Sequence, residues 1–402
     1  MRRNIILINR FYWPDESATA QLLTDLAEHL ANAGYDVNVI TGERGYIQGN
    51  EKYPRQQVHE GVQIHRLSSS GAGRYRLWLR AWDYLLFYLG LVRLVRRIAD
   101  KDSLLITLTD PPLVHSWLRL FFPKLKSIHW SMDVFPEIIT ETTQSIWKKW
   151  ALAPLIWLRN RSLAGTPVVV SLSEEMGQFF KKSSELSAVI PNWSPVEELE
   201  VSEGAIHELR SDWDVSEDDV LVGYSGNLGH VHDSDTVYEA LAEKGAALQE
   251  IPFVFVGGGK RLSVFRELGS DGSAGLQFVP FAPREMTANS LSAIDIHWLS
   301  LYPQFSSLVF PSKFAGICSV GRPCIFVGDT ECELARMIVE HGLGLVVRSG
   351  DADGFQRAVL NLVSDKALRD SMGANAISFY QEYFSKKSGL EKWEQLIKDQ
   401  LS

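Results

Sequence analysis

The sequence predicts an α/β protein built from two doubly wound, Rossmann-like domains. Short runs rich in β-branched residues alternate with helical patterns along the whole chain, which indicates βα repeats and parallel sheets. The alternation stops once, in the acidic stretch 194–218, and then resumes. With 402 residues, 45% hydrophobic and 22% charged, the chain is long enough to bury two separate cores.

The first series of elements covers residues 1–193, which we interpret as the N-terminal domain. Its strands are expected at 4–9, 36–41, 62–67, 104–109, 127–131, 168–173 and 188–191. Apolar residues at helical spacing predict helices at 18–33, 77–98 and 146–163.

The second series covers residues 219–376, which we interpret as the C-terminal domain, after a linker at 194–218. Its strands are expected near 220–224, 251–257, 276–281, 295–301, 323–328 and 344–348. The closing residues 377–402 are helical and rich in aromatic side chains. Because ligands of doubly wound sheets bind beyond the carboxyl ends of the strands, both domains are expected to offer sites there.

Composition and charge narrow the class of protein. The three cysteines, Cys318, Cys324 and Cys332, form no CxxC pair, so neither a disulfide framework nor a zinc site is expected and a cytoplasmic location is the default. No signal peptide is visible, and the longest apolar run, 84–92, is short for a bilayer span. Residues 1–193 carry a net charge of +5 and residues 194–402 one of −14, so the halves are expected to meet different partners.

Three turns in the second half have the pattern of phosphate-binding loops. They are Ser225-Gly226-Asn227-Leu228-Gly229, Gly257-Gly258-Gly259-Lys260 and Pro311-Ser312-Lys313. The first two follow apolar strands and the third opens a helix, an order that presents bare backbone N–H groups to an anion. A nucleoside diphosphate is the expected ligand, with Lys313 as the main cation and Lys260 or Arg261 as alternatives. Ordinary strand-to-helix turns and solvated lysines remain the structural alternatives.

The residues carry a resemblance to a known family. Segments spread over nearly the whole chain match its motifs in order, among them Phe11-Tyr12-Trp13-Pro14-Asp15, Asp133-Val134-Phe135-Pro136-Glu137, Ile190-Pro191-Asn192-Trp193 and Pro311-Ser312-Lys313-Phe314. The chain resembles glycosyltransferases of family 4 with the GT-B fold, in the branch of bacterial exopolysaccharide, colanic-acid and O-antigen pathways. The resemblance implies two domains facing a cleft, final helices that cross back to the first domain, retention of configuration, and neither metal nor other cofactor.

The resemblance also implies a set of donor-binding residues in the second domain. His232 and Asn227 stand where the family usually has basic residues, and Leu308 and Gly316 stand where many members have a pair of glutamates. Glu333, with Glu331 as reserve, is the alternative partner for ribose or sugar hydroxyls, and the loop 305–310 would line the sugar pocket. The donor-binding residues are expected to be Ser225, Gly226, Asn227, Leu228, Gly229, His232, Gly258, Lys260, Phe281, Ser307, Leu308, Lys313 and Glu333.

In the first domain, acidic residues that follow strands are the candidates for chemistry on the acceptor. Asp133 is expected to orient or deprotonate the acceptor hydroxyl with support from Glu137, helix capping being the alternative. The resemblance adds Asp15, Thr19 and Asp110 as acceptor-binding residues. His115 and His129 are interpreted as packing residues, and Asp351-Ala352-Asp353 as a helix cap rather than a metal-binding DxD motif.

Aromatic and basic side chains are interleaved in residues 74–101 and again in 147–161. This mixture is typical of helices at an anionic membrane surface, although a helix with buried aromatics and solvated arginines shows it too. We found no recognised nucleic-acid-binding module.

The sequence therefore predicts a transferase that moves a sugar from a UDP or GDP sugar to a lipid-linked saccharide acceptor. The enzyme is expected to be cytoplasmic, or peripheral on the inner face of the plasma membrane. Two alternatives stay open. One is a GT-B sugar-nucleotide epimerase, and the other is a non-catalytic nucleotide-binding scaffold that lacks the glutamate pair.

Overall fold

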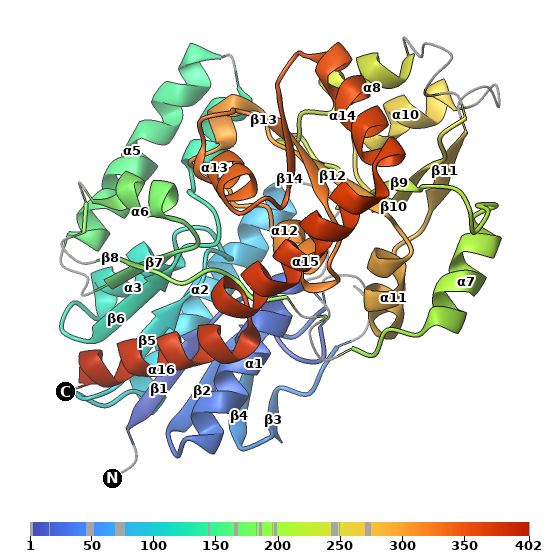
Figure 1. Cartoon of the computed structure of the whole chain (residues 1–402). Coiled ribbons are helices and arrows are strands. Elements are labelled where there is room, and N and C mark those ends of the chain that lie inside the picture. The colour runs from blue at the N-terminus through green and yellow to red at the C-terminus, as the bar shows by residue number, and fades with distance from the viewer. Residues whose placement is uncertain are drawn as a thin grey trace. The chain divides into compact units, whose positions relative to one another are not determined.

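The computed structural model divides the chain into two compact units, residues 1–191 with 389–402 and residues 192–388 (Figure 1). It describes residues 3–15, 17–45, 52–68, 77–143, 145–164, 168–181, 183–184, 187–194, 196, 199–242, 248, 250–269 and 275–401. Both units are α/β with predominantly parallel sheets, as the sequence predicts. None of the described helices combines the length and hydropathy needed to cross a bilayer.

Unit 1 is built on an eight-stranded sheet in the order β3-β4-β2-β1-β5-β6-β7-β8. The strands are β1 (Asn4–Ile8), β2 (Asp36–Gly42), β3 (Gln56–His59), β4 (Val62–Leu67), β5 (Leu104–Thr107), β6 (Lys126–Trp130), β7 (Val168–Ser171) and β8 (Ser187–Val189). Among the strands formed by the described residues of this unit, only β3 runs antiparallel to its neighbour. The expected strand segments of this domain are all present, and β3 is an additional edge strand.

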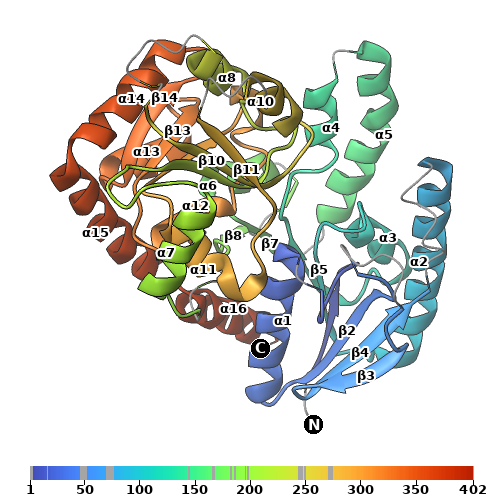
Figure 2. The ribbon, with the colours of Figure 1, turned by 90° about the vertical axis from the view of Figure 1, so that its right-hand side faces the viewer.

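Helices cover both faces of this sheet (Figure 2). They are α1 (Ala18–Asn32), α2 (Leu77–Ile98), α3 (Val114–Phe121), α4 (Glu137–Thr142), α5 (Ile146–Leu163), α6 (Glu174–Phe180) and α16 (Lys386–Leu401). On one face, Phe87 and Leu91 of α2 pack with Ile6 of β1. On the other, Trp393 of α16 lies 4.6 Å from Trp130, between ring centroids. The last helix of the chain is therefore part of the core of unit 1.

Unit 2 contains a six-stranded parallel sheet in the order β11-β10-β9-β12-β13-β14. The strands are β9 (Val222–Asn227), β10 (Phe253–Gly258), β11 (Leu276–Val279), β12 (Ile296–Ser300), β13 (Cys324–Gly328) and β14 (Gly344–Arg348). The helices are α7 (Glu203–Asp212), α8 (Asp235–Ala242), α10 (Leu262–Leu268), α11 (Thr287–Ser292), α12 (Lys313–Ser319), α13 (Glu333–Glu340), α14 (Ala352–Ser364) and α15 (Lys366–Tyr383), with 3-10 turns η2 (Arg284–Met286) and η3 (Pro303–Phe305).

Alternation along β12 and β13 sends neighbouring side chains into two different clusters of the core of unit 2. Trp298 and Ile325 point to the cluster that includes Phe355 of α14. Their neighbours Leu299 and Phe326 point to the opposite cluster with Phe314 of α12. A strand buried on both faces reads as a continuous apolar run, which is why these strands were visible in the sequence.

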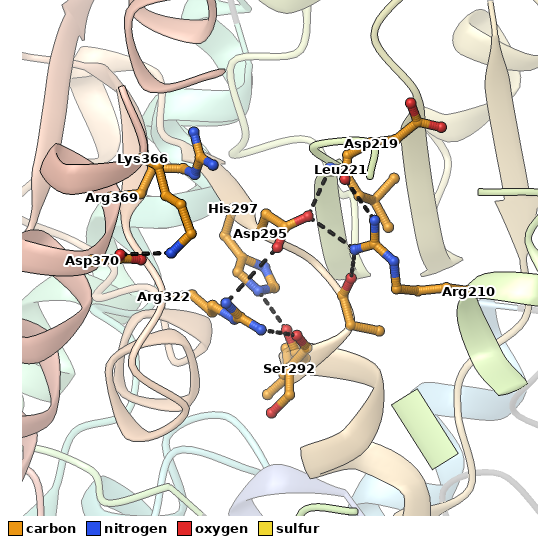
Figure 3. Close-up of polar contacts among 12 residues, drawn as sticks. Arg210, Asp219, Leu221, Ser292, Asp295, His297, Arg322, Lys366, Arg369 and Asp370 are labelled. Carbon is orange, nitrogen blue, oxygen red and sulfur yellow. Dashed lines mark hydrogen bonds and ion pairs between the residues drawn. The ribbon is translucent and has the colours of Figure 1, made fainter. Parts of the chain in front are cut away.

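A polar network fastens α7 to the sheet of unit 2 (Figure 3). The side chain of Arg210 is buried, and its Nη1 lies 2.9 Å from Asp295 Oδ2. The same carboxylate oxygen accepts a hydrogen bond from the backbone N–H of Leu221 at 2.9 Å. The stretch 194–218, interpreted above as a linker, thus contains a helix that is bonded into unit 2.

Candidate functional site

The carboxyl ends of β9 and β10 come together backbone to backbone. The glycine turns expected after these strands begin within them, since β9 extends to Asn227 and β10 to Gly258. A Cβ atom built on Gly257 would lie 2.5 Å from the carbonyl oxygen of Gly226, and one on Gly259 would lie 2.2 Å from that of Leu228. Both glycines also have positive φ. Only glycine permits this approach, because a side chain at either position would clash with the neighbouring backbone.

Lys313, at the start of α12, extends its side chain across the end of β9. Its Nζ lies 4.6 Å from the centroid of the Tyr224 ring and 3.3 Å from His232 Nε2. A Cβ on Gly226 would lie 2.6 Å from Lys313 Cε, so the lysine stem lies directly on this glycine. In the part of the chain that the structure describes, no carboxylate forms an ion pair with Lys313.

The environment of Lys313 makes its charge unfavourable in the ligand-free protein. Burial lowers the pKa of its amine to about 7. A desolvated amine with no counterion is more readily protonated when an anion binds beside it. The site therefore favours a negatively charged ligand at the end of β9.

His232 positions the lysine. Its Nδ1 donates a hydrogen bond to the carbonyl oxygen of Ser300 at the end of β12, at 2.8 Å. This fixes the tautomer and leaves Nε2 as the acceptor that faces Lys313. Burial, then the Lys313 charge, lowers the pKa of His232 to about 4, so the ring is neutral at neutral pH. His232 does not supply the missing positive charge; it accepts a hydrogen bond from the residue that does.

Phe281 covers the end of β10. Its side chain is 59% exposed, and its ring lies 2.9 Å from the position of a Cβ on Gly257 and 3.5 Å from one on Gly258. The structure thus brings together Gly226, Leu228, Gly258 and Lys313 from the three predicted turns, Phe281 from the loop after β11, and His232, which follows the first turn.

Asn227 and Gly229 belong to the same group, because Asn227 pairs with Gly258 across the sheet and the backbone N–H of His232 donates to the carbonyl oxygen of Gly229 at 3.3 Å. The side chains of Lys260, Ser307 and Leu308 lie outside the contacts given above. Lys260 is exposed, and Arg261 is paired with Asp235 and donates to the Tyr302 hydroxyl at 2.8 Å. Leu308 is buried next to Ser307, after η3, and Glu333 is buried as the first residue of α13.

Asp133 of unit 1 follows β6 and lines a cavity of about 20 Å³, room for about one water molecule. Burial raises the pKa of its carboxyl to about 6. His115, His129 and Arg159 line the same cavity. A carboxylate with a raised pKa beside polar side chains is the arrangement that general bases use.

Glu137 is held by a buried arginine. Arg159 Nη1 lies 2.9 Å from Glu137 Oε2 and 3.0 Å from the carbonyl oxygen of Phe135, and its Nη2 contacts Glu137 Oε1. Sequence reasoning named Glu137 and missed Arg159, whose position within an aromatic-rich helix gave no sign of burial. The bidentate pair ties α5 to the start of α4, next to Asp133.

The two histidines of this region are neutral, His115 being buried and His129 partly buried. Nδ1 of His115 and Nδ1 of His129 lie 3.1 Å and 3.3 Å from Thr107 Oγ1. Burial lowers the pKa of His129 to about 4 and that of His115 well below its ordinary value. This agrees with their interpretation as packing residues.

The acceptor-binding candidates lie at the carboxyl ends of β1 and β5. Asp110 forms an ion pair with Arg10 at 3.1 Å, and Arg10 directly follows Asn9 at the end of β1. Asp15 is buried and accepts a hydrogen bond from the Ser17 backbone at 2.8 Å, ahead of α1, and Thr19 lies in the first turn of that helix. Arg10 was missed, although its place after a strand was a usable signal.

Asp351 caps α14, as interpreted, by accepting a hydrogen bond from the backbone N–H of Gly354 at 2.7 Å. Across the described ranges, no group of three His, Cys, Asp or Glu side chains is placed to hold a metal ion. The three cysteines are free and buried.

Solved structures similar to this chain share its fold over almost its whole length. Sucrose-phosphate synthase from Thermosynechococcus elongatus is 17% identical, with a TM-score of 0.73 and 99% of both chains covered. Anabaena HepE, solved in complex with UDP-glucose, is 15% identical, with a TM-score of 0.72 over 98% of this chain and 99% of that one. WaaG, a glycosyltransferase involved in lipopolysaccharide biosynthesis, is 14% identical, with a TM-score of 0.69 over 96% and 98%.

Sequence comparisons agree for both halves of the chain. The putative colanic acid biosynthesis glycosyl transferase WcaI of Escherichia coli K12 is 28% identical over 153 residues, which is 37% of this chain and 36% of that protein. The model of the glycosyl transferase 4-like domain matches residues 18–193, and that of glycosyl transferases group 1 matches residues 205–379. With most of its length described by these two models, the chain belongs to the family 4 glycosyltransferases of the GT-B fold.

Proposed function

We propose that this glycosyltransferase moves a sugar from a UDP or GDP sugar to a lipid-linked saccharide in bacterial surface polysaccharide synthesis, with retention of configuration. The single observation that supports donor binding is Lys313, a partly buried lysine that forms no ion pair with a carboxylate among the described residues and whose side chain lies on the backbone of Gly226. A pyrophosphate offers the charge that this amine lacks and the oxygens that free backbone N–H groups bind.

The base and the sugar of the donor are proposed to bind beside Lys313. The exposed ring of Phe281 over Gly257 and Gly258 offers a face on which a base can stack. HepE, which has the same fold, was solved with UDP-glucose, which favours UDP as the nucleotide. Glu333 is the proposed partner for hydroxyl groups of the ribose or sugar.

Asp133 is proposed to orient the acceptor hydroxyl and to accept its proton. With a pKa of about 6, its carboxyl is mostly ionised at pH 7 and yet more basic than an exposed aspartate. Glu137, neutralised by Arg159, is proposed to position the segment that carries Asp133 rather than to take the proton. Asp15, Thr19 and Asp110 are proposed to contact the acceptor saccharide.

A membrane surface is the proposed place of the reaction, on the cytoplasmic face. Three tryptophans of α5 are largely exposed: Trp147 by 81%, Trp150 by 72% and Trp157 by 65%. Tryptophan side chains favour the boundary between headgroups and acyl chains. Similarity to WcaI and WaaG supports a surface saccharide as the acceptor.

A donor screen tests this function. Nucleotide sugars that bind the folded chain raise its melting temperature, and those that do so are incubated with and without lipid-linked saccharides. Transfer that requires the acceptor supports the proposal, and NMR of the product shows whether configuration is retained. Turnover of donor alone would favour an epimerase, whereas binding without any turnover would favour a scaffold.

A further inference from the structure

A groove of about 490 Å³ lies on unit 1 between α2 and the sheet edge formed by β3 and β4. Figure 2 shows α2 running beside these strands. The lining residues include Arg55, Arg66, Arg93 and Arg97 together with His65, and no acidic residue. None of the candidate acceptor residues named above lines it.

The arginines of the groove differ in the hydrogen bonds and ion pairs that they already form. Arg66 is buried and donates to the carbonyl oxygens of Pro54 and Trp13, at 2.9 Å and 2.8 Å, so it is a fixed charge. Arg93 and Arg97 are exposed and lie one turn apart on α2, and within the described residues neither forms an ion pair or a side-chain hydrogen bond. Their guanidinium groups are available to a ligand.

The floor of the groove is apolar because α2 approaches β4 closely at Gly90. A Cβ on Gly90 would lie 3.2 Å from Leu67 Cδ2. Leu67 and Leu94 line the groove with Gly90. One turn earlier on the same helix face, Leu86 and Leu89 are 40% and 41% exposed. The face thus changes along the helix from exposed leucines to unpaired arginines.

We propose that this groove binds the phosphate of an amphiphilic lipid phosphate. The forked guanidinium groups of Arg93 and Arg97 hold the phosphate oxygens, and the leucines cover the first methylenes of the lipid. A soluble phosphate would use the arginines but leave the apolar floor and the exposed leucines unused. The choice of a lipid phosphate as the ligand rests on the proposed lipid-linked acceptor. The proposal concerns binding of the lipid and not transfer of the sugar.

Vesicle binding by the full chain tests the arginines. The wild type is expected to sediment with vesicles of phosphatidylcholine and phosphatidic acid and not with phosphatidylcholine alone. Replacing both residues, Arg93→Gln with Arg97→Gln, should weaken binding at least about tenfold because two charge-assisted contacts are lost. The control, Lys101→Gln with Lys124→Gln, removes the same charge from exposed positions outside the groove and should change binding only about twofold. An equal loss in both pairs would show diffuse attraction and overturn the proposal.

Two further measurements test the apolar part. Gly90→Leu fills the floor of the groove without changing its charge, so it should weaken vesicle binding as much as the double arginine substitution does. Unchanged vesicle binding by a Gly90→Leu variant that keeps its melting temperature would overturn the proposal. If the Gly90→Leu variant does not fold, the result of the double arginine substitution decides. Short-chain phosphatidic acid should bind more tightly in calorimetry than glycerol phosphate, and equal affinity would mean a site for free phosphate. Nucleotide-sugar binding, measured on the same samples, separates failure of the groove from failure of the proposed transferase function.

Discussion

At the scale of single residues, the proposed donor site depends on a chain of hydrogen bonds from Ser300 through His232 to Lys313. The sequence showed that Lys313 opens a helix and that glycines end the neighbouring strands. It did not show that the lysine is partly buried or that His232 turns its acceptor nitrogen toward it, because both depend on the packing of separate strand ends.

The lowered pKa of Lys313 predicts that donor binding takes up a proton. The free amine has a pKa of about 7, and a bound pyrophosphate raises it, so above pH 7 the ligand binds together with a proton. Affinity for a nucleotide sugar, whose pyrophosphate does not titrate in this range, should fall about tenfold per pH unit above pH 7. Calorimetry at pH 8 in buffers of different ionisation enthalpy measures the uptake.

The exposed Lys260 provides the control. Lys260→Ala should keep the proton uptake, whereas Lys313→Met should lose both the uptake and most of the affinity. A binding enthalpy that is the same in all buffers at pH 8 would contradict the assignment of Lys313.

Ionised Asp133 is expected to lower the stability of the folded protein at neutral pH, as a cost of its proposed catalytic role. Its pKa is about 6 in the folded protein against about 4 in an unfolded chain, so the folded state binds the proton more tightly. The stabilisation is complete below pH 4 and is lost as the pH rises to 6. Asp133→Asn should therefore raise the free energy of unfolding by about 1–2 kcal/mol at pH 7, and not at pH 4.

The same substitution should lower the rate of transfer by about 10²–10⁴-fold if Asp133 takes the acceptor proton. Asp102→Asn, which neutralises an exposed acid of the same unit, should change neither quantity appreciably. Denaturation and activity assays at both pH values make the comparison. Full activity of Asp133→Asn would remove this residue from the catalytic step.

At the scale of elements, sequence reasoning succeeded where a pattern was local. Strands buried on both faces, such as β12 and β13, were visible as apolar runs. The edge strand β3 was missed because its exposure alternates over polar residues and it has no apolar run. Helix α7 was missed because the acidic stretch around it resembles a linker, and its attachment depends on Asp295, distant in the sequence.

Arg210 is expected to be the residue that keeps α7 in place. Arg210→Met removes one of the partners of Asp295 and the donor to the carbonyl oxygens of Ser216 and Asp219. The loss should destabilise unit 2 by about 2–4 kcal/mol, less than for a fully buried pair because Asp295 is 23% exposed. The melting transition that nucleotide binding raises reports the effect.

A surface pair of the same unit provides the comparison. Arg357 lies 3.6 Å from Asp351, and both side chains are largely exposed, so Arg357→Met should cost less than about 1 kcal/mol. Equal melting temperatures of the two variants would contradict a structural role for the Arg210 network.

At the scale of the whole molecule, the chain order does not follow the division into units. Helix α15 belongs to unit 2, yet the residues from 389 onward belong to unit 1, where Glu394 lies 3.0 Å from His29. The sequence indicated terminal helices rich in aromatic residues. Their return to the first domain was known only from the resemblance, because no local pattern specifies which core a helix joins.

This division predicts that two substitutions in distant parts of the chain act on separate melting transitions. Trp393 is fully buried against Trp130, so Trp393→Ala should lower the stability of unit 1 by about 3–5 kcal/mol. The transition of unit 2, recognised in calorimetry because a nucleotide sugar raises it, should stay in place, and Arg210→Met should show the reverse pattern. Trp150→Ala removes a tryptophan that is 72% exposed and should leave both transitions unchanged. A shift of the nucleotide-sensitive transition by Trp393→Ala would contradict the assignment of the terminal helix to the core of unit 1.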